Sequence, residues 1–143
     1  MKTTVAIVLT AFLAFPAWAE PPVLEPRDGT TADLNEFLWV KRPLVIFADN
    51  PADPRFQDQL ELLAEDLPGL ITRDVVILTD TSQSPKSALR QELRPRGFML
   101  VVLAKDGSVV LRKPVPWHVR EIARAIDKLP LRQQEIRDRL NKQ

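Results

Sequence analysis

The architecture of this chain is read most directly from residues 44–56, LVIFADNPADPRF, where an apolar run leads through a polar loop into a helical pattern. Residues 44–48 are continuously apolar, which is typical of a strand covered on both faces. After the loop, Pro54 suits the first turn of a helix, and apolar residues from Phe56 to Leu67 recur at helical spacing. The segment therefore predicts a buried strand, a turn at the edge of a sheet and a covering helix.

Similar patterns on either side predict the rest of an α/β domain. Further strands are expected at residues 75–78, 98–104 and 109–111, the last two joined by a turn at Lys105-Asp106-Gly107. Helices are expected at residues 31–39, 54–67, 85–93 and 116–129, with Pro68-Gly69 and Pro130 as breaks. This order requires one mixed central sheet with helices on both faces.

The N-terminus predicts export. Lys2 precedes an apolar run over residues 5–15, and Ala17-Trp18-Ala19 has the small-x-small pattern of a signal-peptidase site. The run is too short to span a bilayer, so we expect no stable membrane span after signal removal. The predicted organisation is a cleaved signal peptide at 1–19, an extended segment at 20–30, a domain at 31–129 and a charged helical segment at 130–143. The expected location is the periplasm or the cell exterior.

Composition excludes several kinds of chemistry. The chain has no cysteine, which rules out disulfides, thiolate metal sites and cysteine-based redox catalysis. Without the signal, nineteen Lys and Arg balance nineteen Asp and Glu. Such a balance gives no electrostatic reason to expect nucleic acid as a partner.

The order of elements resembles the thioredoxin fold, and residues 98–111 resemble its closing hairpin. A narrower resemblance is to a small family of bacterial exported proteins known as domain of unknown function 4174. It is carried by residues 44–48 with Asp53-Pro54-Arg55-Phe56, by Lys105-Asp106-Gly107, and by Asp127, Pro130, Arg132 and Glu135. The resemblance implies a single thioredoxin-like domain and supplies no activity.

The candidate ligand-binding residues follow the predicted strands. The loop after the first buried strand contains Asp49, Asn50, Asp53 and Arg55, at the place where thioredoxin-like enzymes carry their reactive cysteine, and Asp80 ends the next strand. Ligands of open α/β sheets bind at this edge, and three aspartates suit a hard cation such as Ca²⁺ or Mg²⁺. The simpler interpretation is that Asn50 or Asp53 caps the Pro54 helix. We therefore assign no metal and no cofactor.

The remaining candidates are basic. His118, the single histidine, is a possible general base, although a histidine at the boundary of the core is the simpler interpretation. Arg90, Arg94 and Arg96 have side chains that suit a carboxylate or phosphate. Because Glu92 interrupts them and no glycine-rich phosphate loop is present, we interpret them as surface residues. The segment after Pro130 is interpreted as a solvated helix, with a partner-binding helix as the alternative.

The sequence thus predicts an exported, noncatalytic thioredoxin-like domain that binds a protein or a small ligand. No catalytic residue is assigned, and the partner is an unknown exported protein or small ligand. The alternative is a cysteine-independent enzyme, or a protein that binds divalent cations, using the loop at residues 49–55.

Overall fold

The computed structural model describes residues 23–143, so the predicted signal peptide lies outside the described residues. Five strands form one mixed sheet in the order β1-β3-β2-β4-β5. The strands are β1 (Arg27–Asp28), β2 (Arg42–Phe47), β3 (Val75–Asp80), β4 (Met99–Leu103) and β5 (Val109–Lys113). β1, β2 and β3 are parallel, whereas β4 is antiparallel to both β2 and β5. The carboxyl ends of β2 and β3 therefore meet at one edge of the sheet.

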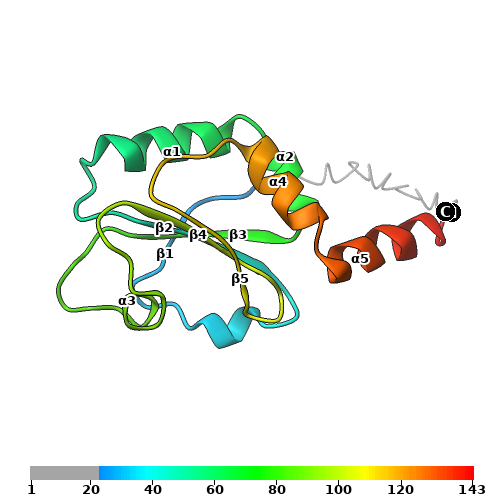
Figure 1. Ribbon diagram of the computed structural model, residues 1–143, viewed down its shortest axis with the longest axis horizontal. Helices are drawn as coiled ribbons and strands as arrows, with labels where there is room; N and C mark the ends of the chain where they lie inside the picture. The colour runs from blue at the N-terminus through cyan, green and yellow to red at the C-terminus, as the bar shows by residue number, and fades with distance from the viewer. Residues whose placement is uncertain (1–22) are drawn as a thin grey trace, which may run out of the picture.

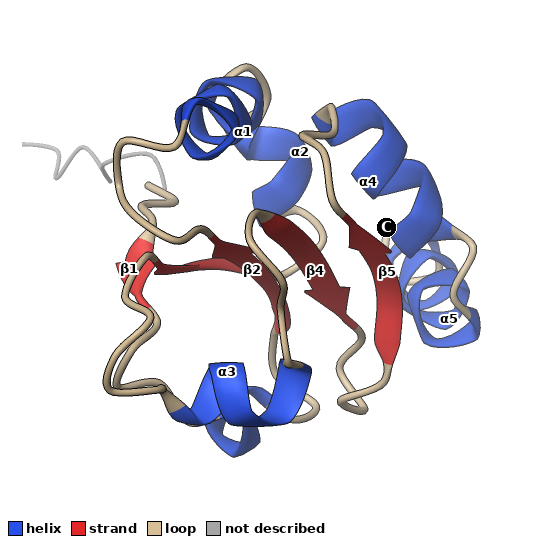
Figure 2. Ribbon diagram, turned by 60° about the vertical axis from the view of Figure 1, so that its left-hand side comes forward, coloured by secondary structure: helices blue, strands red, loops and turns tan. Residues whose placement is uncertain are grey.

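Helices cover both faces of this sheet (Figures 1 and 2). They are the 3₁₀ helix η1 (Leu34–Phe37) and the α-helices α1 (Pro54–Ala64), α2 (Leu67–Ile71), α3 (Ala88–Leu93), α4 (Val119–Asp127) and α5 (Pro130–Leu140). One core lies between the sheet and α1, α2 and α4, and a second lies between the sheet and η1 and α3. Among the described residues, no helix is long and apolar enough to cross a membrane.

Strand β2 shows how one sequence supplies both cores. Successive side chains of a strand point to opposite faces. Leu44 and Ile46 accordingly join the core under α1, whereas Val45 and Phe47 join the core under α3. All four are fully buried, so an unbroken apolar run was required here.

The helix expected over residues 54–67 is in fact two helices. α1 ends at Ala64, and Asp66 then caps α2 by accepting a hydrogen bond from the backbone N–H of Gly69 at 2.9 Å. Pro68 lies in the first turn of α2, where a missing N–H does no harm. The expectation that Pro68-Gly69 stops a helix was therefore wrong.

Two other expected helix boundaries also differ. Pro85 does not open a helix: it follows a cis peptide bond with Ser84 in the preceding loop, and Ser87 caps α3 instead. The first expected helix is the short η1, and it ends before Trp39, which has a left-handed backbone conformation with φ of 65°.

The C-terminal helix α5 is not merely solvated. Arg42, at the start of β2, is fully buried, and its guanidinium donates to both carboxylate oxygens of Glu135, at 3.3 and 3.1 Å. The Nζ of Lys105 lies 2.8 Å from the same carboxylate. Arg132, also buried, pairs with Asp127 at 3.3 Å and with Glu135 at 3.3 Å. These ion pairs fix one side of α5 to the sheet.

Candidate functional site

Residues 49–55 span the loop after β2 and the start of α1, and most of their polar groups form hydrogen bonds with nearby residues. The Oδ1 of Asn50 accepts from the N–H of Ala52 at 2.9 Å. Asp53 caps α1 by accepting from the N–H of Arg55 at 2.9 Å, and the guanidinium of Arg55 donates to both Asp53 oxygens, at 3.1 and 2.8 Å. Hydrogen bonding from Arg55 lowers the pKa of Asp53. Of the two predicted caps, Asp53 is therefore the one that caps α1, whereas Asn50 makes a local turn within the loop.

Asp80, at the end of β3, belongs to a buried polar cluster. Its carboxylate accepts from the N–H of Ser82 at 3.1 Å, from the Nε of Arg90 at 3.1 Å, and from the hydroxyl of Ser87. Asp80 is 1% exposed, and Arg90 is 8% exposed. Each carboxylate oxygen thus already accepts a hydrogen bond, and through Ser87 and Arg90 the carboxylate of Asp80 holds α3 against the end of β3.

Arg90 is therefore not the surface residue that the sequence suggested. Its Nη2 also donates to the carbonyl oxygens of Ala48 at 2.7 Å and Asp80 at 3.0 Å. The guanidinium lies 5.4 Å from the ring centroid of Phe47. Arg90 thus joins the carboxyl ends of β2 and β3 to α3, and the charge of Asp80 compensates its own.

The structure does not bring the candidate residues into one site. Asp49 and Arg90 line one cleft, whereas His118 lines a separate cavity with Glu65 and Arg120. The Nδ1 of His118 lies 3.8 Å from the Glu65 carboxylate, and both side chains are largely exposed. Within residues 23–143, no group of three His, Asp or Glu side chains is close enough to hold a metal ion.

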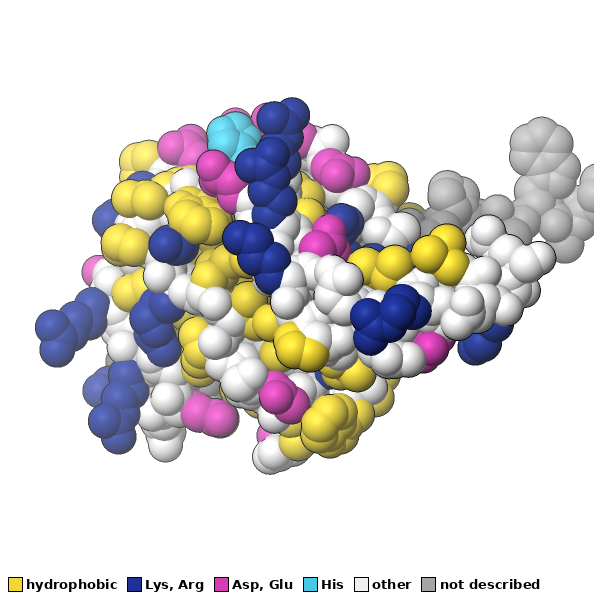
Figure 3. Space-filling view, turned by 45° about the vertical axis from the view of Figure 1, so that its right-hand side comes forward, with side chains coloured by type: hydrophobic (Ala, Val, Ile, Leu, Met, Phe, Trp, Pro, Cys, Tyr) yellow, Lys and Arg dark blue, Asp and Glu magenta, His cyan; other side chains and the backbone are white. Residues whose placement is uncertain are grey.

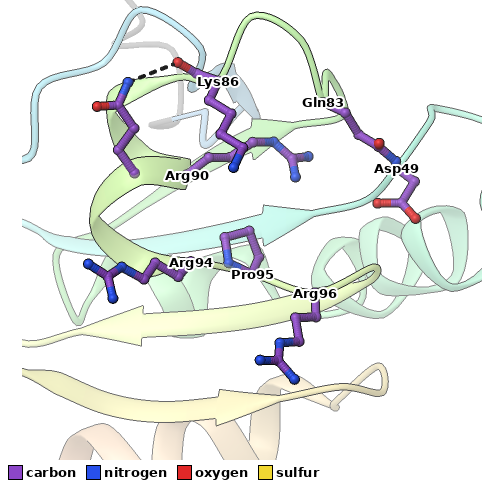
Figure 4. A pocket seen from close by; sticks show the side chains of 8 residues that line it. Asp49, Gln83, Lys86, Arg90, Arg94, Pro95 and Arg96 are labelled. Carbon is purple, nitrogen blue, oxygen red and sulfur yellow. Dashed lines mark hydrogen bonds between the residues drawn. The ribbon is translucent and has the colours of Figure 1, made fainter.

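The arrangement that does form at this edge is basic. A cleft of about 500 Å³ is lined by Asp49, Gln83, Lys86, Arg90, Gln91, Arg94, Pro95 and Arg96. We call it the basic cleft. Figure 4 shows Gln83 and Lys86 on the loop before α3, Arg94 at the end of that helix and Arg96 on the segment that leads to β4.

The charges of the basic cleft favour an anion. Lys86, Arg94 and Arg96 are exposed and can turn toward a ligand, whereas Arg90 is held in place beneath them. Asp49 is the single acidic residue that lines the cleft. Guanidinium groups match carboxylate and phosphate geometry, so the cleft is suited to a ligand with one of these groups.

Sequence reasoning named Arg90, Arg94 and Arg96 but dismissed them, and it overlooked Lys86 and Gln83. The available signal was the crowding of basic residues just after the second parallel strand, at the edge where α/β proteins bind ligands. Helical spacing would place Arg90 and Arg94 on one face of a helix, but Arg94 lies outside the helical conformation. It ends α3 in a left-handed conformation with φ of 49°, and this turns the chain toward Arg96.

The sheet order and its covering helices define a thioredoxin-like α/β domain, and solved structures agree. Over 72% of this chain and 85% of the other, the fold is similar to that of a reduced 2-Cys peroxiredoxin of Plasmodium vivax, at 15% identity and a TM-score of 0.56. A chloroplastic thioredoxin z is similar over 77% of this chain and 96% of its own, also at 15% identity and a TM-score of 0.56. At this identity the likeness shows the fold alone.

The chain belongs to the family described as Domain of unknown function (DUF4174), whose model matches residues 33–135. A comparison with curated proteins finds no match. The resemblance to this family and the expected fold class are thus both confirmed. The matched range runs from the cap of η1 to Glu135, so it includes the basic cleft and the ion pairs that fix α5.

Proposed function

We propose that this protein is an exported, noncatalytic thioredoxin-like domain that binds an anionic ligand or protein segment in the basic cleft. The observation that carries the proposal is the position of Lys86, Arg94 and Arg96, three exposed cations around a cavity of about 500 Å³. The cavity lies at the edge of the sheet where ligands of open α/β folds bind. One lining residue, Asp49, comes from the loop where thioredoxin-like enzymes carry their reactive cysteine, which supports a ligand at this edge.

The backbone at Arg94 supports this proposal. A left-handed conformation costs a residue with a side chain roughly 1–2 kcal/mol, and glycine or asparagine is usual at such helix ends. Arg94 is exposed, so packing of its side chain does not compensate this cost. A charged side chain held there at the mouth of a basic cleft is consistent with a role in binding.

The alternative functions have weaker support. An enzyme or a cation site built on residues 49–55 needs free carboxylates, but Asp53 is engaged by Arg55 and the Asp80 carboxylate is engaged by Arg90. The single histidine, His118, lines another cavity. Asp49 alone remains close to the cleft, beside cations that would repel a metal ion.

Binding can be tested with a charge-matched pair of variants. The double variant Arg94→Glu with Arg96→Glu reverses two charges at the cleft. The control, Arg120→Glu with Arg124→Glu, makes the same change in net charge on exposed positions of α4. The probes are a fluorescently labelled hexaglutamate peptide and inorganic phosphate, titrated at low salt.

We expect the cleft variant to lose at least tenfold in affinity for the peptide and the control to lose less than twofold. Affinity should also fall as salt is added, because the charges are exposed and screened. Phosphate alone binding as well as the peptide would identify a small anion as the ligand class. Equal losses of affinity in both variants would show that the peptide is attracted by the overall charge of the protein, and would refute binding in the basic cleft.

Export is part of the proposal and has its own test. Residues 1–19 have the pattern of a signal peptide, and the cleavage pattern ends at Ala19. Expression of the full chain in a Gram-negative host, followed by fractionation and mass spectrometry, should yield a periplasmic or secreted form that begins at Glu20. An intact chain that remains in the cytoplasm would refute this part of the proposal.

A further inference from the structure

A second surface lies at the opposite end of β2, away from the basic cleft. The connection from η1 to β2 places three consecutive apolar side chains in solvent: Leu38, Trp39 and Val40, which are 36%, 68% and 58% exposed. Trp39 borders a cavity of about 310 Å³ together with Leu129, Pro130 and Leu131 from the junction of α4 and α5. We call this cavity the Trp39 groove. Figure 3 shows exposed hydrophobic side chains on this side of the molecule.

The conformation of Trp39 is held by the fold rather than by its own preference. Its φ of 65° is unfavourable for a bulky residue, at a cost of roughly 1–2 kcal/mol. Its backbone N–H donates to the carbonyl of Lys105 at 2.7 Å, which ties this connection to the β4–β5 turn. The backbone at Trp39 is thereby held in place, and the indole is exposed to solvent, as an aromatic anchor at a protein interface is.

Two positively charged side chains lie at the floor of the Trp39 groove, and both are paired with carboxylates. Lys105 and Arg42 both line it. The ammonium of Lys105 has three N–H groups, and two carboxylates, Asp74 and Glu135, lie at 2.8 Å each. Among residues 23–143 the structure shows no third acceptor for this ammonium. Beneath it, the Nε of Arg42 is the one buried side-chain polar atom in residues 23–143 without a hydrogen-bond partner.

The acidic groups near the groove are already committed. Asp106 borders the groove, but its Oδ1 accepts from both the N–H and the hydroxyl of Ser108, at 2.9 and 2.6 Å. Glu135 is bound by Arg42 and Lys105. The groove thus combines apolar walls with N–H donors on Lys105 and Arg42 that have no acceptor, and these donors suit an apolar group that carries a hydrogen-bond acceptor such as a terminal carboxylate.

We propose that the Trp39 groove binds the C-terminal residue of a partner polypeptide, when that residue is a large aliphatic or aromatic one. Its side chain lies between Trp39 and Leu131, and its terminal carboxylate accepts a hydrogen bond from Lys105. A cavity of about 310 Å³ suits one or two residues. Because Trp39 is 68% exposed, the rest of the partner can also cover the indole. This site is independent of the basic cleft.

The test changes the ligand first, so that it does not depend on the folding of a variant. Two acetylated tetrapeptides, Gly-Ser-Gly-Leu with a free carboxylate and the same peptide as the C-terminal amide, are titrated into the purified protein by calorimetry. We expect the free acid to bind at least tenfold more tightly than the amide, because the amide lacks the charge that Lys105 binds. Equal affinities, or no measurable binding of the acid, would overturn the proposal.

Protein variants then locate the site. Trp39→Ala should reduce the affinity for the free acid at least tenfold, and Val115→Ala, which truncates a 51% exposed apolar residue elsewhere, should leave it unchanged. Unchanged binding by Trp39→Ala would refute the location. Sedimentation and vesicle-binding measurements test the other occupants. A dimer dispersed by Trp39→Ala would assign the groove to a second copy of the chain, and vesicle binding lost in that variant would assign it to a membrane. Either result would overturn the proposal.

Discussion

Replacing Glu135 with glutamine removes the carboxylate at which the ion pairs of α5 converge. Arg42, Lys105 and Arg132 all lie within 3.3 Å of its oxygens. Partial burial raises the pKa of Glu135, but hydrogen bonds from Lys105 and Arg42 outweigh this effect and lower the pKa from 4.5 to about 2. At 1.36 kcal/mol per pKa unit, this difference corresponds to about 3 kcal/mol of folding free energy at neutral pH.

The expected result is a free energy of unfolding about 3 kcal/mol lower for Glu135→Gln than for the unchanged protein at pH 7, measured by urea denaturation. Because folding lowers the pKa, the stabilisation is complete above pH 4.5 and is lost as the pH falls toward 2. The difference between the two proteins should therefore shrink to roughly 1 kcal/mol at pH 3.

A control on the same helix distinguishes this effect from a general change of charge. Asp138 is exposed on α5 and contacts Gln134. Asp138→Asn should change the free energy of unfolding by less than about 0.5 kcal/mol at either pH. If Glu135→Gln costs less than about 1 kcal/mol at pH 7, or if its cost does not decline with pH, the reasoning about α5 is wrong.

Two further substitutions test the polar contacts inside the domain. Gln59 on α1 is fully buried and exchanges two 2.9 Å hydrogen bonds with the backbone of Trp117, so Gln59→Leu should cost about 2–3 kcal/mol in urea denaturation; a loss under about 0.5 kcal/mol would mean that water replaces both bonds. Asp80→Asn leaves the Arg90 guanidinium without its counter-charge and should cost about 3 kcal/mol, measured by the same method. A stable Asp80→Asn protein would show that the carbonyls of Ala48 and Asp80 suffice to hold Arg90.

Much of the fold could be predicted because it is encoded locally. A continuous apolar run such as residues 44–48 is typical of a strand covered on both faces, and its β-branched residues and flanking prolines favour a strand over a helix. The Asp106-Gly107 turn was also visible, since Gly107 has a φ of 86° that glycine adopts freely. The break between α1 and α2 was encoded as well, in Asp66 as a cap and Pro68 in the first turn. Proline followed by glycine usually ends a helix, so the pattern predicts a stop where the structure begins a second helix.

The site residues could be predicted less well because their roles depend on distant partners. Arg132 and Glu135 lie in a highly charged segment that is typical of a solvated helix. Glu135 is nevertheless bound by Arg42, which lies 93 residues earlier in the chain. In the sequence Arg90 has the pattern of a surface residue, but in the structure it is buried against Asp80 at the end of β3. Charge alone does not distinguish these cases from true surface residues. The distinction requires the tertiary arrangement that buries one partner and brings the other to it.

The exposed residues with left-handed backbone offer a way to separate folding from binding. Trp39 and Arg94 have φ of 65° and 49°, and each borders one of the two proposed sites. Glycine removes the steric cost at either position, so Arg94→Gly should raise the free energy of unfolding by about 1 kcal/mol, and Trp39→Gly should leave it equal or higher. Binding affinity should fall in both variants, and each variant should lose affinity at one site only. Arg94→Gly should lower the affinity for the hexaglutamate peptide without changing the affinity for the peptide with a C-terminal leucine. Trp39→Gly should have the reverse effect on the two affinities. If either glycine variant is less stable than the unchanged protein by more than about 1 kcal/mol, its side chain contributes to packing and the strain argument for that site is wrong.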